Sequence, residues 1–344
     1  MRDATRLLQT SGPAAATEAI QRTLQQAPAP EKGPAADATN PYATNPIEEV
    51  EAAEGKGRFI GASCTNQAGT RAYKIYIPSS YEGQALPLVV MLHGCKQNPD
   101  DFAAGTGMNH IAEQNNCLVV YPAQIPAANG ANCWNWFRPG DQQRDRGEPS
   151  IIAEITRETI RTYHVDSSRV YIAGLSAGGA MAAVMGATYP ELYAAVGIHS
   201  GLPAGAAHDV PSAFAAMANG VGATRPMKGG SHSSPKKAVP VIVFHGDRDT
   251  TVHPRNGERC TADFIAGHNE QAIVENGKAP QGRAYTRTIR RDNNGKAISE
   301  QWVIHGAGHA WSGGSRKGSY TDPEGPDASR EMIRFFLMHA HAAR

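Results

Sequence analysis

The chain has almost no net charge and no long apolar run. Its 344 residues include 33 Lys and Arg against 32 Asp and Glu, a formal net charge of +1. Because this balance does not attract a polyanion, we expect no nucleic-acid partner. No stretch approaches about eighteen consecutive apolar residues, so no membrane span is predicted. Residues 1–26 scatter charges among short apolar runs, and we see no secretory signal peptide there.

Cysteine is also scarce. The five cysteines include no C-x-x-C pair, which argues against a disulfide framework and against structural zinc. We therefore predict no metal site. Cys64, Cys117 and Cys260 suggest no partner, and burial is the expectation for them. No internal repeat is visible, and no pattern specifies an oligomeric state.

The composition divides the chain in two. Residues 1–55 are expected to form an N-terminal extension, with short helices within 1–26 followed by a linker rich in Pro, Ala and Asn. Residues 56–344 are expected to form the main folded domain, because strand-length apolar runs alternate there with helical segments. Residues 203–238, rich in Gly, Ala, Pro and Ser, suggest an excursion above the sheet.

Several of the apolar runs are continuous rather than alternating, which favours strands covered on both faces. Strands alternating with helices predict an α/β fold with a mostly parallel central sheet and helices on both faces. Ser150 is a candidate N-cap for the first of three predicted helices. The predicted strands are 73–78, 87–94, 117–122, 169–174, 194–201, 239–246 and 299–306, and the predicted helices are 150–164, 176–190 and 327–343.

The segment "VYIAGLSAGG" places Ser176 between a predicted strand and a predicted helix. The pattern G-x-S-x-G in that context is typical of a nucleophile elbow, a strained turn whose neighbours must be small. A tight turn without chemistry would also need Gly174 and Gly178. The flanking strand and helix favour Ser176 as a nucleophile.

A serine nucleophile needs a base and an acid, which in this topology follow it in the order acid, histidine. "FHGDRDTTVHP" offers Asp247 and Asp249 after a strand, and we favour Asp249 because Asp247 more readily shapes the turn. "WVIHGAGHAW" offers His305 at a strand end and His309 in the glycine-rich loop beyond it. We favour His309 as the base.

The oxyanion of an acyl-transfer reaction needs two hydrogen-bond donors. One is expected from the backbone N–H of Ala177, the residue after the nucleophile. The other is expected from Cys95 in "LHGC", where Gly94 permits a tight turn after an early strand.

These segments together resemble the esterase family named after poly(3-hydroxybutyrate) depolymerases. The similarity runs from about residue 58 to the C-terminus and includes "LHGCKQNPDDFAAGTGMNHIAE", "YPAQ", "CWNWF" and "GAGHAWSGG". It implies an α/β-hydrolase fold and a serine esterase that needs no metal or cofactor. The implied substrate is a poly- or oligo-hydroxybutyrate ester. The implied residues are the triad Ser176, Asp249 and His309, the oxyanion donors Cys95 and Ala177, and Trp134, Trp136 and Trp311 near the acyl chain.

The resemblance leaves alternatives open. Feruloyl and acetylxylan esterases are similar to this family, so plant-polysaccharide esters are a second substrate class. A serine peptidase or a non-catalytic binding protein on the same fold are the rivals from other classes. The family comparison also suggests a disulfide between Cys95 and Cys133, against the alternative of free thiols. Family members are often secreted, which predicts an extracellular location, whereas the missing signal peptide favours the cytoplasm.

Overall fold

A computed structural model describes residues 57–220, 239–266, 271–280 and 282–342 of the chain. The helices and linker predicted within residues 1–55 lie outside the described residues, as does half of the predicted excursion at 203–238, namely 221–238. In the described part, no helix is long and apolar enough to cross a membrane.

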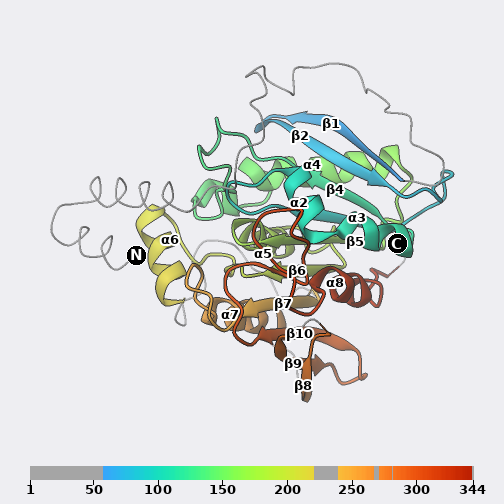
Figure 1. Cartoon of the computed structure of the whole chain (residues 1–344). Helices are drawn as coiled ribbons and strands as arrows, with labels where there is room; N and C mark the ends of the chain where they lie inside the picture. The colour runs from blue at the N-terminus through green and yellow to red at the C-terminus, as the bar shows by residue number, and fades with distance from the viewer. Residues whose placement is uncertain (1–56, 221–238, 267–270, 281, 343–344) are drawn as a thin grey trace. The chain divides into compact units, whose positions relative to one another are not determined.

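The described strands form one large mixed sheet in the order β1-β2-β4-β3-β5-β6-β7-β10-β9-β8. The central strands are parallel, and antiparallel pairs close both edges, with β1 and β2 at the top of Figure 1 and β9 and β8 at the bottom. This confirms the α/β fold. The central strands are β4 (Leu118–Pro122), β3 (Leu88–Leu92), β5 (Val170–Leu175), β6 (Ala195–His199), β7 (Val241–Gly246) and β10 (Ala297–Ile304).

Every strand predicted from the sequence lies in this sheet, but three edge strands were not predicted. These are β1 (Arg58–Asn66), β9 (Ala284–Arg291) and β8 (Gln271–Lys278), while the predicted run at 73–78 belongs to the longer β2 (Gly69–Ile77). Nearly all of β8 is exposed, and β9 is mostly half-buried. Such edge strands carry no continuous apolar run, which is the pattern that revealed the central ones.

Helices cover both faces of the sheet, as predicted. Leu88, Val90 and Leu92 of β3 point into one core, and Val89 and Met91 point into the other. This alternation follows from the two-residue period of a strand. The first core holds α4 (Gly147–Thr162), α5 (Ala177–Thr188), α6 (Val210–Asn219) and α7 (Arg255–Ile265), and the second holds α2 (Pro99–Thr106), α3 (Met108–Asn115) and α8 (Ala328–Phe336).

Two predicted helix ends were wrong. The helix α4 begins at Gly147 after Arg146, so Ser150 lies inside its first turn, where its hydroxyl donates to the Gly147 carbonyl at 2.8 Å. Asp141 accepts the Glu148 N–H at 2.8 Å, so the cap comes from outside the helix. The final helix α8 ends at Phe336 rather than at 343.

The turn from β5 into α5 is the tightest part of the fold. Ser176 has φ 57° and ψ −118°, which an L-residue rarely adopts. A Cβ on Gly178 would lie 2.0 Å from the Leu92 carbonyl oxygen, and one on Gly174 would lie 2.3 Å from the Gly178 carbonyl carbon. Both glycines are therefore required because backbones touch there, and the turn is packed directly against the end of β3.

We predict that Gly178→Ala lowers the free energy of unfolding by at least about 2 kcal/mol, since the new methyl group meets rigid backbone. Urea unfolding followed by circular dichroism measures the change. Gly130→Ala is the matched control, because a Cβ there meets nothing within 4 Å, and we expect a change within about 0.5 kcal/mol. Equal effects of the two substitutions would contradict this account of the turn.

Candidate active site

The three residues predicted as a triad follow three strands of the parallel part of the sheet. Ser176 follows β5, Asp249 lies in the loop after β7, and His309 lies in the loop after β10. The sheet order β5-β6-β7-β10 makes these strands close neighbours. Because parallel strands end at the same edge, all three side chains are brought to that edge, where ligands bind in open α/β sheets.

Asp249 and His309 are hydrogen-bonded to each other. The distance from His309 Nδ1 to Asp249 Oδ2 is 2.7 Å, and the Asp249 side chain is fully buried. The other carboxylate oxygen accepts the backbone N–H groups of Thr251 and Val252, each at 2.8 Å. The carboxylate can only accept when ionised, so it fixes the proton on His309 Nδ1 and leaves Nε2 as the free lone pair.

The electrostatics keep Asp249 ionised. Burial by itself raises the pKa of Asp249, but hydrogen bonds from His245 and His309, and their charges, lower it by more. The pKa therefore lies well below the usual range for Asp. His245 Nε2 donates to the Val252 carbonyl at 2.9 Å and lies 3.4 Å from Asp249 Oδ2, which places a second imidazole against the same carboxylate.

Asp247 and His305, the less favoured candidates for the acid and the base, pair with each other. His305 Nδ1 lies 3.0 Å from Asp247 Oδ2, and both side chains are more than a third exposed. The Gly306 N–H donates to Asp247 Oδ1 at 2.7 Å, so Asp247 ties two loops together at the surface. In the described part of the chain, no group of three or more His, Cys, Asp or Glu side chains could hold a metal ion.

Ser176 is half-buried at the head of α5. Its backbone N–H donates to the His199 carbonyl at 2.9 Å, and its carbonyl accepts the Ala180 N–H at 2.9 Å. The hydroxyl makes no hydrogen bond within the described residues, including to His309. Such bonds are often long without a substrate and tighten in the reacting complex.

The loop that carries Cys95 is fixed beside Ser176. A Cβ on Gly94 would lie 3.7 Å from the Ser176 Cβ. The Gly94 N–H donates to Gln97 Oε1 at 2.9 Å, and the Lys96 N–H donates to the Ala131 carbonyl at 2.7 Å. Cys95 and Cys133 form a disulfide in the structure, with their Cα atoms 4.2 Å apart.

Both predicted oxyanion donors are available. Within the described residues, neither the Cys95 N–H nor the Ala177 N–H donates a hydrogen bond. Ala177 is the first residue of α5, where N–H groups lack partners and the helix dipole is positive. The two amides belong to segments that meet at Gly94 and Ser176.

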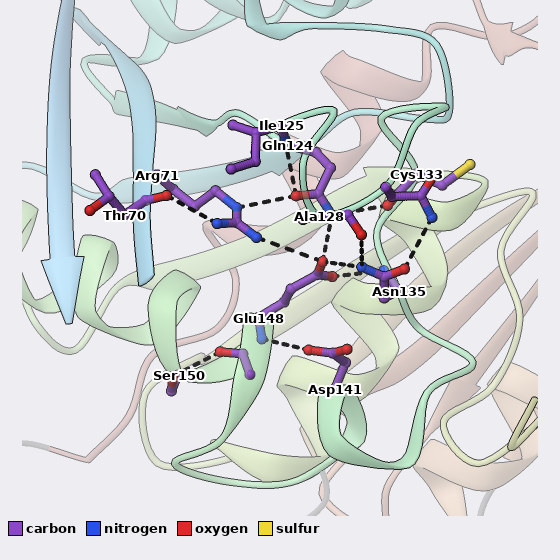
Figure 2. Close-up of polar contacts among 12 residues, drawn as sticks. Thr70, Arg71, Gln124, Ile125, Ala128, Cys133, Asn135, Asp141, Glu148 and Ser150 are labelled. Atoms are coloured by element: carbon purple, nitrogen blue, oxygen red, sulfur yellow. Dashed lines mark hydrogen bonds and ion pairs between the residues drawn. The ribbon is translucent and has the colours of Figure 1, made fainter. Parts of the chain in front are cut away.

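A buried polar network, which was not predicted from the sequence, lies next to the loop that carries Cys95 (Figure 2). Its centre is the carboxylate of Glu148, which accepts Gln124 Nε2 at 2.5 Å, Asn135 Nδ2 at 2.6 Å and the Asn135 N–H at 2.7 Å. Arg71 lies 4.0 Å from it and donates Nε to Gln124 Oε1 at 3.1 Å. Burial raises the pKa of Glu148, against the smaller effect of these donors.

The network reaches the oxyanion loop through His93. The Gln124 N–H donates to His93 Nε2 at 3.1 Å, and His93 Nδ1 donates to the Gly94 carbonyl at 2.8 Å. Burial lowers the pKa of His93 to about 4, so the ring stays neutral and can accept the amide. Gln124 also donates to the Cys133 carbonyl at 2.9 Å. Through Gln124 and His93, the buried carboxylate of Glu148 thus helps to position the chain at both ends of the disulfide.

The three tryptophans predicted near the acyl chain are all buried, with at most 5% of their surface exposed. Trp311 packs in the core: its Nε1 donates to Ser329 Oγ at 3.1 Å, and its ring stacks on His199 at 5.0 Å. Trp134 Nε1 has no acceptor within the described residues and its ring lies 5.7 Å from that of His93. Substrate contact by Trp134, Trp136 and Trp311 stays a prediction.

His199, at the end of β6, joins the serine turn to the histidine loop. Its carbonyl accepts the Ser176 N–H, and its Nε2 accepts the Ser312 N–H at 2.9 Å. Burial lowers the pKa of His199 well below its usual value, and electrostatic interaction with the nearby His245 and His309 rings lowers it further. The ring is therefore neutral, and its Nε2 keeps the lone pair that accepts the Ser312 N–H. A histidine at a strand end was the one sign of this role in the amino-acid sequence.

We predict that His199→Phe frees the Ser312 amide, because Phe keeps the ring stacking but cannot accept a hydrogen bond. Hydrogen exchange of the Ser312 amide is expected to speed up by about tenfold or more. Tyr171→Phe is the control, since it removes a buried 2.8 Å hydrogen bond to the His339 carbonyl. If both variants change Ser312 exchange equally, His199 is not what holds this loop.

Comparison with known proteins agrees with the fold and shows the family. The sequence profile described as Esterase PHB depolymerase matches residues 71–282. Poly(3-hydroxyalkanoate) depolymerase C of Paucimonas lemoignei is 34% identical over 250 residues, which cover 71% of this chain and 59% of that protein. Feruloyl esterase B of Neurospora crassa is 30% identical over 245 residues, which cover 67% of this chain and 80% of that protein.

The solved structure of an acetyl xylan esterase from Aspergillus awamori has the same fold. It superposes with a TM-score of 0.61 at 23% identity, covering 81% of this chain and 99% of that one. The present chain spans less than two thirds of the Paucimonas lemoignei depolymerase. Since the family profile covers more than half of the chain, the protein belongs to the Esterase PHB depolymerase family, on an α/β-hydrolase fold.

Proposed function

We propose that the protein is a serine esterase in which Ser176 is the nucleophile, His309 the general base and Asp249 the residue that orients the base. The observation that carries this proposal is the 2.7 Å hydrogen bond between His309 and a buried, ionised Asp249, at the sheet edge where Ser176 is held in its strained turn. This is the arrangement that activates a serine hydroxyl.

The proposed reaction starts from a His309 ring with its proton on Nδ1 and a free lone pair on Nε2. His309 Nε2 removes the hydroxyl proton as Ser176 Oγ attacks the ester carbonyl, and Asp249 stabilises the imidazolium that forms. The Cys95 and Ala177 N–H groups stabilise the oxyanion. His309 then gives the proton to the departing alcohol. Water, deprotonated by the same ring, releases the acid from the acyl-enzyme.

The substrates that we propose are poly- or oligo-hydroxybutyrate-type esters. Family membership and the similarity to the Paucimonas lemoignei depolymerase support this class. Feruloyl or acetylxylan esters of plant polysaccharides are the second candidate, favoured by the similarity to the Neurospora crassa feruloyl esterase.

We also propose an extracellular location. The disulfide between Cys95 and Cys133 supports it, because disulfides persist in oxidising compartments and the pair braces a loop of the site.

We predict that Ser176→Ala keeps the fold and loses covalent labelling by an activated phosphonate, with ester turnover reduced by about 10⁴-fold or more. Intact mass after labelling and circular dichroism measure the two effects. Ser63→Ala, at an exposed position of strand β1, is the control and is expected to label normally. Undiminished labelling of Ser176→Ala would rule out the assigned nucleophile.

We predict that p-nitrophenyl butyrate is hydrolysed while the matching p-nitroanilide is not, which separates an esterase from a peptidase and from a binding protein. Among natural ester types, kcat/KM is expected to be highest for a soluble hydroxybutyrate trimer, compared with a feruloylated sugar and an acetylated xylan oligomer. A preference of tenfold or more for either sugar ester would move the assignment to the second candidate.

A further inference from the structure

A cavity lies near the start of β10, at the opposite end of this strand from the candidate active site. Its volume is about 190 Å³, and its walls come from β9, β10, α8 and the segment after α8. Lys296 and Ala297 line it where β10 begins, whereas His309 follows the end of the same strand. The eight residues of β10 separate the two places by roughly 25 Å.

Glu300, the acidic side chain that lines this cavity, already accepts several hydrogen bonds. Glu300 is almost fully buried and accepts Arg287 Nη2 at 2.8 Å, Arg287 Nε at 3.1 Å and Arg334 Nη2 at 2.5 Å. Trp302 Nε1 donates to it as well, at 3.2 Å. The single negative charge of Glu300 is therefore shared by two guanidinium groups.

Two further cations line the cavity with no acidic partner among the described residues. The Arg291 guanidinium donates to the Gly295 carbonyl at 2.8 Å, within its own turn. The acid nearest in that turn, Asp292, uses Oδ1 to accept the backbone N–H groups of Asn294 and Lys296, both at 2.9 Å. The Lys296 ammonium forms no ion pair in the described part of the chain. Four cationic side chains therefore line the cavity with one carboxylate, and two of them have no acidic partner among the described residues.

A buried imidazole without hydrogen bonds also lines the cavity. His339 is 2% exposed, and neither of its ring nitrogens has a hydrogen-bond partner within the described residues. Burial lowers the pKa of His339 to about 4, and the positive charge of Lys296 contributes. The ring is therefore neutral, with one donor and one acceptor unused. An unsatisfied buried polar group costs about 1–3 kcal/mol, which a ligand would recover.

The remaining walls, formed by Ile289, Ala297 and Met338, are apolar. From this combination we propose that the cavity binds a small organic carboxylate with a short apolar body. The carboxylate lies against Lys296 and Arg291 and accepts the His339 N–H, and the hydrocarbon part lies against the apolar walls. The volume holds about six water-sized groups, which suits an acid of about four carbons.

This inference does not rest on the chemistry of Ser176. The site is remote from the candidate triad, and its occupation is a binding equilibrium. A ligand there would bridge the turn between β9 and β10 to the segment after α8, so it would stabilise the folded chain in proportion to its occupancy.

Isothermal titration of the full chain with sodium butyrate tests the proposal, with sodium phosphate and sodium chloride as comparison anions. We expect saturable butyrate binding that is weakened about tenfold or more in Lys296→Gln and in His339→Phe. Lys278→Gln, an exposed lysine on β8 outside the cavity, is the matched control and is expected to bind like the unchanged chain.

Lys296→Gln decides the outcome, because this exposed side chain can be changed without disturbing the core. No saturable butyrate binding, or equal binding by Lys296→Gln and the unchanged chain, would overturn the proposal. Phosphate binding as tight as butyrate would show a general anion site and overturn the organic class. Loss of esterase activity in Ser176→Ala leaves all these titrations unaffected, so the two proposals fail separately.

Discussion

The site depends on one backbone contact, the approach of the turn after β5 to the end of β3. The space between Gly178 and the Leu92 carbonyl does not admit even a methyl group. This contact places Ser176 beside Gly94. It also brings together the N–H groups of Cys95 and Ala177, which have no acceptors among the described residues. A strained φ at Ser176 is tolerated because the packed backbones on both sides leave no alternative.

The other segments of the site are fixed by buried polar groups rather than by helices or strands. Glu148 gathers the amides of Gln124 and Asn135 behind the disulfide, and His199 holds the loop that carries His309. Each group is buried and each has its hydrogen bonds satisfied. Such networks are costly when half-satisfied, so they allow a loop only one arrangement. The precision that catalysis requires then comes from positions outside the proposed triad.

The sequence predicted the parts of this molecule that have a local pattern. Continuous apolar runs revealed the central strands, and position within the loops favoured Asp249 and His309 over Asp247 and His305. The edge strand β8 was not predicted because its exposed residues have no such run. The Glu148 network could not be predicted either: Arg71, Gln124 and Glu148 are far apart in the chain and meet only in three dimensions. The burial of Trp311 likewise follows from packing against His199, which no spacing rule encodes.

Among the histidines at this edge of the sheet, protonation geometry singles out His309. His93 and His199 use Nε2 to accept backbone N–H groups, so those lone pairs are occupied, and burial keeps both rings neutral. His245 uses its Nε2 proton on the Val252 carbonyl. His309 differs because its Nδ1 proton is held by an ionised carboxylate while its Nε2 has no partner among the described residues. A ring in that state can take a proton and be stabilised as a cation, which is what a general base must do.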